Sequence, residues 1–274
     1  MARGSTGRGR ASLWIGAVIV GVLALIALAA PWLSSYDPTM PDLAGELAGP
    51  GAAHLLGQDE LGRDLWARLA MGSRVSLSIG LAVVFVSSLV GTLLGGLCGY
   101  RGGLWDSALM RVIDVLQAFP GILLAIALAY GLGPGYLNVV FALSVLGWVG
   151  YARLVRGQVL QIREEEFVQA ARAVGVPDLQ ILIRHIYPNL LGPLAVQCTF
   201  GLAAAILSES SLAFLGLGVQ GVPSWGAMLD GGTDFLLVAP HVAFFPGAAL
   251  FATILAFNFL GDGLRDLLDV KGRA

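Results

Sequence analysis

The sequence is short of charge and of the residue patterns that build catalytic or nucleotide-binding sites. Only 12% of its 274 residues are charged, against about 25% in an ordinary soluble domain. Its one lysine, Lys271, does not follow a glycine-rich loop, so a phosphate-binding loop ending in Gly-Lys-Ser/Thr is absent. The zinc motif His-Glu-x-x-His and the nucleophile elbow Gly-x-Ser-x-Gly are also absent. The sequence therefore predicts no catalytic residue, no metal site and no cofactor held by this chain.

Disulfides and nucleic-acid binding have equally little support. The two cysteines, Cys98 and Cys198, both fall inside apolar runs, where a free cysteine acts as a small packing residue. The net charge is −2, and the arginines are not gathered into a basic patch. We therefore expect no nucleic-acid partner.

Hydrophobic residues dominate instead. They make up 57% of the chain, the mean hydropathy is +0.80, and a membrane helix needs roughly 20 apolar residues. The sequence predicts an all-α, polytopic membrane protein with six transmembrane helices. The expected spans are residues 12–33, 75–98, 107–131, 136–154, 191–215 and 241–260. The first run could also be read as a cleavable signal peptide, but it is longer than a usual signal core and five further spans follow.

The intervals between spans complete the predicted organisation. A basic head covers residues 1–11, a loop with a short interfacial helix from Asp59 to Leu69 covers 34–74, and a polar tail covers 263–274. Residues 75–262 form the expected core domain, with a glycine-rich loop at 216–240. Phe119-Pro120-Gly121 predicts a kink in the third span. Glycines and serines in the second span, Gly91 and Gly95 among them, predict close helix approach.

The basic residues predict the orientation. Thirteen of the 16 fall at the two chain ends, after span two or around the elbow described below, and only Arg63, Arg68 and Arg74 lie in the 34–74 loop. Basic loop residues remain cytoplasmic. Both termini and the 162–191 interval are therefore expected in the cytoplasm, with loops 34–74 and 216–240 outside.

The longest polar interval after residue 75 is residues 162–191, which we call the elbow. Apolar and small side chains recur at helical spacing in each of its halves. They are Phe167, Ala170, Ala171 and Val174, then Leu179, Leu182, Ile183 and Ile186. Gly175 suits the position after a helix, Pro177 suits a helix start, and Pro188 is expected to end the second helix. The pattern predicts a helix–turn–helix against which a partner presses.

Three polar groups fall within the predicted spans. Glu209 lies in span five near Ser208 and Ser211, and an ionisable residue in a span is costly and usually faces a pore or a partner. Two interpretations stay open: a pathway or gate residue, or a carboxylate hydrogen-bonded between helices. Arg111 and Asp114, three residues apart near the start of span three, are expected to form a structural ion pair.

The elbow resembles the motif that defines permease subunits of binding-protein-dependent ABC importers. That motif reads Glu-Ala-Ala, three residues, Gly, nine residues, then Ile-x-Leu-Pro. Ala170, Ala171, Gly175 and Pro188 keep this spacing, whereas Gln169 replaces the glutamate, and His185 and Tyr187 replace Ile and Leu. Further strings are similar to the peptide/nickel permeases, in particular the dipeptide and oligopeptide C-type subunit. They lie at residues 54–64, 110–120, 150–156, 214–226 and 258–266.

This resemblance implies a type I ABC importer permease in a bacterial inner membrane, with both termini cytoplasmic. It implies three kinds of protein partner: a second, different permease subunit, one or two cytoplasmic ATPases that carry ATP and Mg²⁺, and an external solute-binding protein. The elbow then corresponds to the helices that couple the permease to an ATPase groove. The residues implied in coupling are Phe167, Gln169, Ala170, Ala171, Arg172, Gly175, Pro177, Asp178, His185 and Pro188.

The substrate stays open at this stage. Dipeptides and oligopeptides are the first expectation, with nickel chelates, glutathione or another small solute of the same family as alternatives. A stand-alone secondary transporter is a further alternative, although the halves of the chain show no convincing repeat. An intramembrane hydrolase is disfavoured because no nucleophile and base stand together in the sequence.

Overall fold

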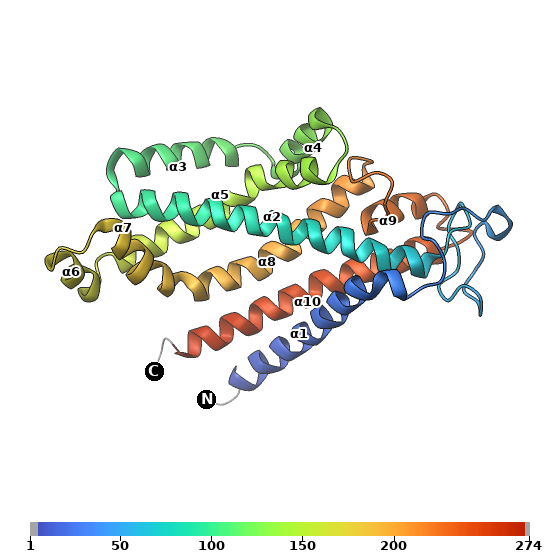
Figure 1. The fold of residues 1–274 in the computed structure, drawn as a ribbon, viewed down its shortest axis with the longest axis horizontal. Helices are drawn as coiled ribbons and strands as arrows, with labels where there is room; N and C mark the ends of the chain where they lie inside the picture. Colours follow the sequence, from blue (N-terminus) through green and yellow to red (C-terminus); the bar gives the residue numbers. More distant parts are fainter. Residues whose placement is uncertain (1–4, 272–274) are drawn as a thin grey trace.

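The protein is a bundle of long helices in the computed structural model, which describes residues 5–271 (Figure 1). The long helices are α1 (Ser5–Ala29), α2 (Leu65–Arg101), α5 (Tyr136–Ile162), α8 (Tyr187–Phe214) and α10 (His241–Lys271). The shorter ones are α3 (Gly103–Gln117), α4 (Gly121–Leu132), α6 (Glu166–Ala173), α7 (Asp178–Ile181) and α9 (Trp225–Thr233). Single turns occur at η1 (Ala30–Trp32) and η2 (Leu43–Gly45), and a π turn, η3 (Leu182–Ile186), joins α7 to α8. The all-α prediction is confirmed, since the described residues contain only an isolated bridge, Gln58 to Asp64, and no strand.

Among the described residues, five helices are long and apolar enough to cross a membrane, or six if α3 and α4 count as one broken span. The break falls at the predicted kink, but it is sharper than a kink because the two helix axes differ by 84°. Pro120 has an extended backbone (φ −59°, ψ 119°), and proline has no N–H to continue the hydrogen bonding of α3. The third predicted span is therefore two helices.

The helices extend beyond several of the predicted spans. α1 begins at Ser5, inside the predicted head, and α10 continues to Lys271, through most of the predicted tail. Residues 1–4 and 272–274 of that head and tail lie outside the described residues. The expected interfacial helix at 59–69 is not a separate element, because α2 starts at Leu65 and runs without interruption to Arg101. The start is fixed by the Asp64 carboxylate, which accepts a hydrogen bond from Ala67 N at 2.7 Å.

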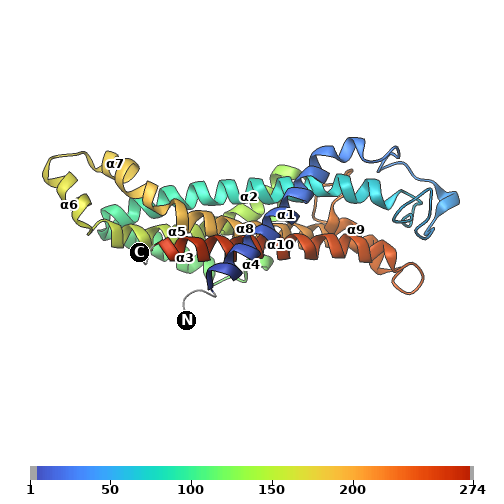
Figure 2. The ribbon, with the colours of Figure 1, turned by 90° about the horizontal axis from the view of Figure 1, so that it is seen from below.

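The bundle has two distinct ends. α6 and α7 project at one end, which we call the elbow end, and residues 34–64 with α9 gather at the other, the loop end (Figures 1 and 2). The start of α1 and the finish of α10 both point toward the elbow end (Figure 1). α1 and α10 lie side by side along one flank, whereas α2, α5 and α8 form the centre.

α2 and α5 approach closely because glycines line their contact, as predicted. A Cβ atom at Gly91 would collide with the backbone of α5 at Trp148 and Ala152, and one at Gly95 would collide with the backbone of Ala152. Small residues four apart form a flat stripe that lets two helix backbones meet. This pair, together with α4 and α8, surrounds the main hydrophobic core of the bundle.

Candidate functional site

The elbow is a helix–turn–helix, as predicted, but its second helix does not end at Pro188. α6 closes at Ala173, and Gly175 turns the chain with φ +85°, a left-handed conformation that glycine adopts without strain. α7 then continues through the π turn directly into α8. Pro188 is the second residue of α8, directly after the π turn, and the helix continues past it through this altered hydrogen-bond pattern. The elbow is therefore one rigid extension of the span that follows it.

Buried side chains hold the elbow against the bundle. Val168, Ile181, Leu182 and Ile186 are fully or almost fully buried and pack against Val155 and Val159 of α5, among others. Other apolar side chains of the same elbow point away from the bundle. They are Phe167, Val174 (85% exposed), Leu179 and Ile183. A short helix that buries one apolar residue and exposes several has a surface suited to a second partner.

A tyrosine at the end of α2 ties the elbow down. The Tyr100 hydroxyl donates to Asp178 Oδ1 at 2.8 Å and accepts from Arg172 Nη2 at 3.2 Å. The Arg172 guanidinium also lies over the Tyr100 ring, 5.4 Å from its centroid. The hydrogen bond to Tyr100 raises the pKa of Arg172 above its ordinary value. Arg172 and Asp178, both predicted as coupling residues, thus contact Tyr100 and fix the elbow's position.

Two shallow depressions flank the elbow. One, of about 400 Å³, is lined by Pro177, Leu179, Gln180, Ile183 and Arg184. The other, of about 350 Å³, is lined by Glu164, Gln169, Arg172 and Ala173. Gln169 is held by a hydrogen bond from its Nε2 to Glu164 O at 2.9 Å, and Asn189 Nδ2 donates to His185 O at 2.6 Å. Predicted coupling residues line both depressions, Pro177 in the first and Gln169 and Arg172 in the second, whereas Ala171 is half-buried.

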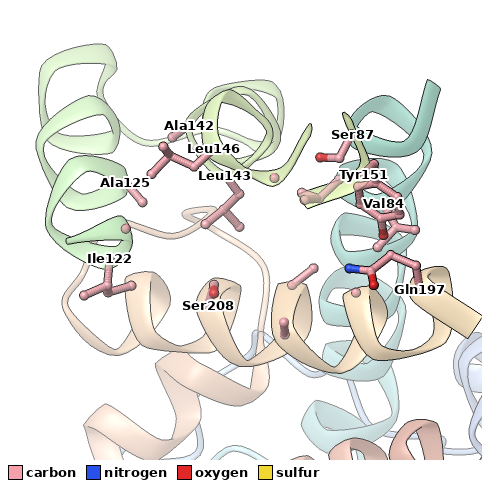
Figure 3. A pocket seen from close by; sticks show the side chains of 16 residues that line it. Val84, Ser87, Ile122, Ala125, Ala142, Leu143, Leu146, Tyr151, Gln197 and Ser208 are labelled. Carbon is pink, nitrogen blue, oxygen red and sulfur yellow. The ribbon is translucent and has the colours of Figure 1, made fainter. Parts of the chain in front are cut away.

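A cavity of about 330 Å³ lies in the middle of the bundle, between α2, α4, α5 and α8 (Figure 3). Its walls are mostly small and apolar, for example Ala125 and Leu143. Its polar lining comes from Ser87 of α2, Tyr151 of α5, and Gln197 and Ser208 of α8. Figure 3 shows Gln197 and Ser208 rising from α8 while Ser87 and Tyr151 stand near α2. None of the described residues that line the cavity carries a charge.

The three predicted pathway residues do not lie together. Ser208 lines the cavity. Ser211 is half-buried and does not line the cavity, and its Oγ donates to Leu207 O at 2.8 Å. Glu209 is fully buried outside the cavity, where its Oε2 accepts from Ser210 Oγ at 3.3 Å and its side chain faces Ser76 of α2. This placement favours the interpretation of Glu209 as a carboxylate held between helices.

The predicted pair of Arg111 with Asp114 is wrong, because Asp114 pairs across helices. Arg153 Nη2 of α5 lies 2.7 Å from Asp114 Oδ1. One turn along α5, Arg156 donates to both carboxylate oxygens of Asp106, at 2.9 and 2.6 Å. α3 lies beside α5, so its carboxylates meet the arginines of the neighbouring helix rather than a residue of their own. Both pairs fasten α3 to the elbow end of α5.

The loop end buries a connected polar cluster. The Asp59 carboxylate accepts hydrogen bonds from Arg63 Nε at 2.8 Å and from the backbone N–H groups of Leu61 and Arg63. Arg68 Nε lies 3.0 Å from Asp59 Oδ2 as an ion pair. His54 Nδ1 lies 2.9 Å from Asp64 Oδ2. Arg68 Nη1 reaches Pro38 O at 2.9 Å. The loop is therefore a folded unit seated on the first turns of α2.

Comparison with known proteins places these features in a family. A family model described as "Binding-protein-dependent transport system inner membrane component" matches residues 91–273. A second, described as "N-terminal TM domain of oligopeptide transport permease C", matches residues 12–50. The matched regions contain the whole elbow and the α4, α5 and α8 walls of the cavity.

Curated relatives agree with the family models. The chain is 46% identical over 257 residues to "Glutathione transport system permease protein GsiD" of Shigella dysenteriae serotype 1 (strain Sd197), across 93% of this chain and 85% of that protein. The proteins of the same name from Escherichia coli O157:H7 and Escherichia coli O6:K15:H31 (strain 536 / UPEC) match with the same identity and coverage. The similarity therefore extends over nearly the full chain.

Proposed function

The chain belongs to the family of binding-protein-dependent transport system inner membrane components, and we propose that it imports glutathione or short peptides through a path shared with a second permease. It is a non-catalytic permease subunit of an ABC importer, a multi-pass protein of the inner membrane. Membership of the family implies a partner permease, an ATPase and a solute-binding protein. The partner permease is, in this proposal, a different chain, and one or two ATPases complete the complex.

The elbow surface is the observation that carries the proposal. Val174 is 85% exposed, and Phe167, Leu179 and Ile183 are exposed beside it, although Val168 and Ile181 of the same elbow are fully buried. A surface of this kind is stable in the assembled protein only when a partner covers it. The ATPase groove is the proposed cover, with Phe167, Gln169, Ala170, Pro177, His185 and Pro188 in or near the contact. Arg172, Gly175 and Asp178 hold the elbow in shape, with Ala171 packed beneath.

The orientation in the membrane is also proposed. The elbow end carries Arg163, Arg172 and Arg184, and the start of α1 and the finish of α10 point the same way. Basic segments stay on the cytoplasmic side. The elbow and both termini are therefore assigned to the cytoplasm, and the loop end faces the solute-binding protein. Closure of the ATPase pair would rock the two permeases through their elbows.

Energy and cofactor belong to the partners in this proposal. The chain has one lysine and no phosphate-binding loop, so ATP and Mg²⁺ are assigned to the ATPase subunits. The lipid bilayer is the remaining partner, and no nucleic acid takes part.

Glutathione ranks first among the proposed substrates, because the relatives that match 93% of the chain are named for glutathione transport. The match of residues 12–50 to the oligopeptide permease C model supports short peptides as the second candidate. Uptake of labelled glutathione and of labelled dialanine into proteoliposomes that hold the complete complex, with its binding protein outside, separates them. Saturable, ATP-dependent uptake of neither solute would overturn the proposed substrate class.

Affinity purification of the tagged chain in mild detergent tests the docking proposal. We expect a second permease and ATPases to co-purify, and we expect Val174→Asp to lose the ATPases by at least about tenfold, because a buried interface charge costs more than 1.4 kcal/mol. Leu237→Asp is the matched control, since Leu237 is 100% exposed at the loop end. Full ATPase recovery with Val174→Asp would refute docking at the elbow.

A further inference from the structure

The wall of the cavity between α2, α4, α5 and α8 contains two buried hydroxyl groups that have no oxygen or nitrogen partner among the described residues. Ser87 is 1% exposed and Tyr151 is 4% exposed, yet neither Ser87 Oγ nor the Tyr151 hydroxyl makes a hydrogen bond in the described part of the chain. The Cys198 thiol, a weak acceptor, faces the Tyr151 hydroxyl. A buried hydroxyl without a good partner is destabilising, and hydrocarbon offers no water to replace the partner. Both groups therefore retain the capacity to bind something in the cavity.

Two glycines make the room that these hydroxyls occupy. A Cβ atom at Gly147 would fall on Ser87 Oγ, and a Cβ atom at Gly201 would fall on the Tyr151 hydroxyl. Both glycines also line the cavity. The backbone of α5 and α8 is thus shaped around the two polar groups, and the hydroxyls are built into the cavity wall.

Helix α8 supplies further neutral polar groups to the lining. Gln197 offers an amide donor and acceptor and Ser208 a hydroxyl, both on α8 and both half-buried (Figure 3). The remaining lining is apolar or glycine, and no Asp, Glu, Lys, Arg or His is among the described lining residues. A charged ligand group would be uncompensated here, whereas an amide N–H and C=O would find partners.

We propose that this cavity is a binding site for an uncharged peptide group of the transported solute, held by Ser87, Tyr151, Gln197 and Ser208. Its volume of about 330 Å³ lies within the range of small-molecule pockets. The solute's charged ends project out of the cavity past the exposed residues Ile122 and Ala204. A lipid chain fits the apolar walls but leaves all four polar groups unpaired. This inference rests on the proposed function, because it takes the solute to contain an amide bond.

The test uses the purified complex of both permeases with their ATPases and a neutral probe, radiolabelled N-acetyl-alanyl-alanine amide, in equilibrium dialysis without binding protein. We expect the probe to bind, and we expect Tyr151→Phe and Ser87→Ala each to weaken its Kd by about three- to tenfold, the usual worth of one hydrogen bond. Ser144→Ala is the matched control for serine, because Ser144 is also buried and unpartnered but does not line the cavity. Tyr130→Phe, at an exposed residue of α4, is the control for tyrosine. Both controls should bind as the unmodified complex does.

Absence of probe binding to the unmodified complex, or equal Kd values in the cavity variants and their controls, overturns the proposal. The outcome is separable from failure of the proposed function, which is read in the uptake of glutathione and dialanine by the same preparation. Uptake without probe binding removes the cavity site and leaves the importer. Probe binding that depends on Tyr151 and Ser87, without uptake of either solute, supports the site and removes the assigned solutes.

Discussion

The two ends of the bundle differ in what lies beneath their exposed side chains. The loop end buries charge: Asp59 is 2% exposed and is surrounded by Arg63, Arg68 and backbone N–H groups. The elbow end exposes Val174 and Leu179, which point away from the buried apolar cluster around Val155, Val159 and Ile181. Both ends expose apolar side chains, Leu237 at the loop end among them. Beneath them, the loop end buries ion pairs, whereas the elbow end buries the apolar side chains of Val168, Ile181 and Ile186.

The largest effect is expected at the loop end, where removal of one charge leaves others buried. Asp59→Ala should lower stability by about 3–5 kcal/mol, the usual cost of breaking a buried ion pair, because Arg68 loses its carboxylate in a buried position. Thermal unfolding of the purified chain in detergent measures it. Asp37→Asn is the control: hydrogen bonds from Thr39 hold the pKa of Asp37 below its usual range, but the residue lies in an exposed turn. An equal loss of stability in both variants would show that the burial of Asp59 and its ion pairs does not stabilise the loop end.

The second effect is expected at the elbow turn. Gly175→Val should cost about 1–2 kcal/mol locally, since φ is +85° there and side chains disfavour this conformation. No atom lies within 4 Å of the position that a Cβ would take, so the cost is one of backbone conformation alone. We expect an assembled complex with reduced ATP-driven uptake.

Gly157→Val in α5 is the matched control for that substitution. Gly157 also has open space around its Cβ position, but it lies in the helix without a positive φ. Uptake should remain near the unmodified level in this variant. Unaltered uptake with Gly175→Val would show that the shape of the turn does not govern coupling.

The third effect concerns the attachment of the elbow to α2. Tyr100→Phe removes the hydroxyl that donates a hydrogen bond to Asp178 and accepts one from Arg172. This loss should destabilise the elbow by about 1–2 kcal/mol, as for hydrogen bonds to charged groups. Hydrogen exchange of residues 166–181 should quicken while exchange at the loop end stays unchanged. Tyr36→Phe in the exposed loop provides the comparison, and faster exchange at both ends would mean that the two ends are not independent.

The smallest effect on stability is expected at the two ion pairs that join α3 to α5. Asp114→Asn should change stability by less than about 1 kcal/mol, because its side chain and that of Arg153 are largely exposed. Asp106→Asn should cost more, since the bidentate contact with Arg156 is less exposed. Thermal unfolding of the two variants side by side gives the order, and the reverse order would contradict the geometry.

The sequence predicted those features that depend on neighbouring residues in the chain. The apolar runs, the turn at Gly175, the break at Pro120 and the glycine stripe of α2 were all recognisable because composition and spacing determine them. Features that depend on contacts between distant segments were not. Asp114 pairs with Arg153 and not with Arg111, which is nearer in the sequence, because α3 packs against α5. Helix α2 starts at Leu65 because Asp64 caps it there.

The candidate sites show the same division. The elbow residues follow a motif, so most were named in advance. The sequence did not single out Tyr100, and it placed Tyr151 in a family string without a role. Their contacts emerge only when α6 and α7 meet α2, and when α5 meets α8. The predicted helix end at Pro188 was wrong. A proline is found both where a helix ends and within the first turn of a helix, and spacing alone does not distinguish the two positions.

The π turn at Leu182–Ile186 sets the phase of the long helix that contains it. A π turn inserts one residue into the helical repeat, which rotates everything before it by about 100° relative to everything after it. The angle around the helix axis between Leu179, on the outward elbow face, and Gln197, in the cavity, therefore differs from the angle that an uninterrupted α-helix would give. Deletion of one residue from this turn would rotate the elbow about the helix axis relative to α8. The one inserted residue thus sets the direction of the outward elbow face independently of the direction of the cavity-lining face of α8.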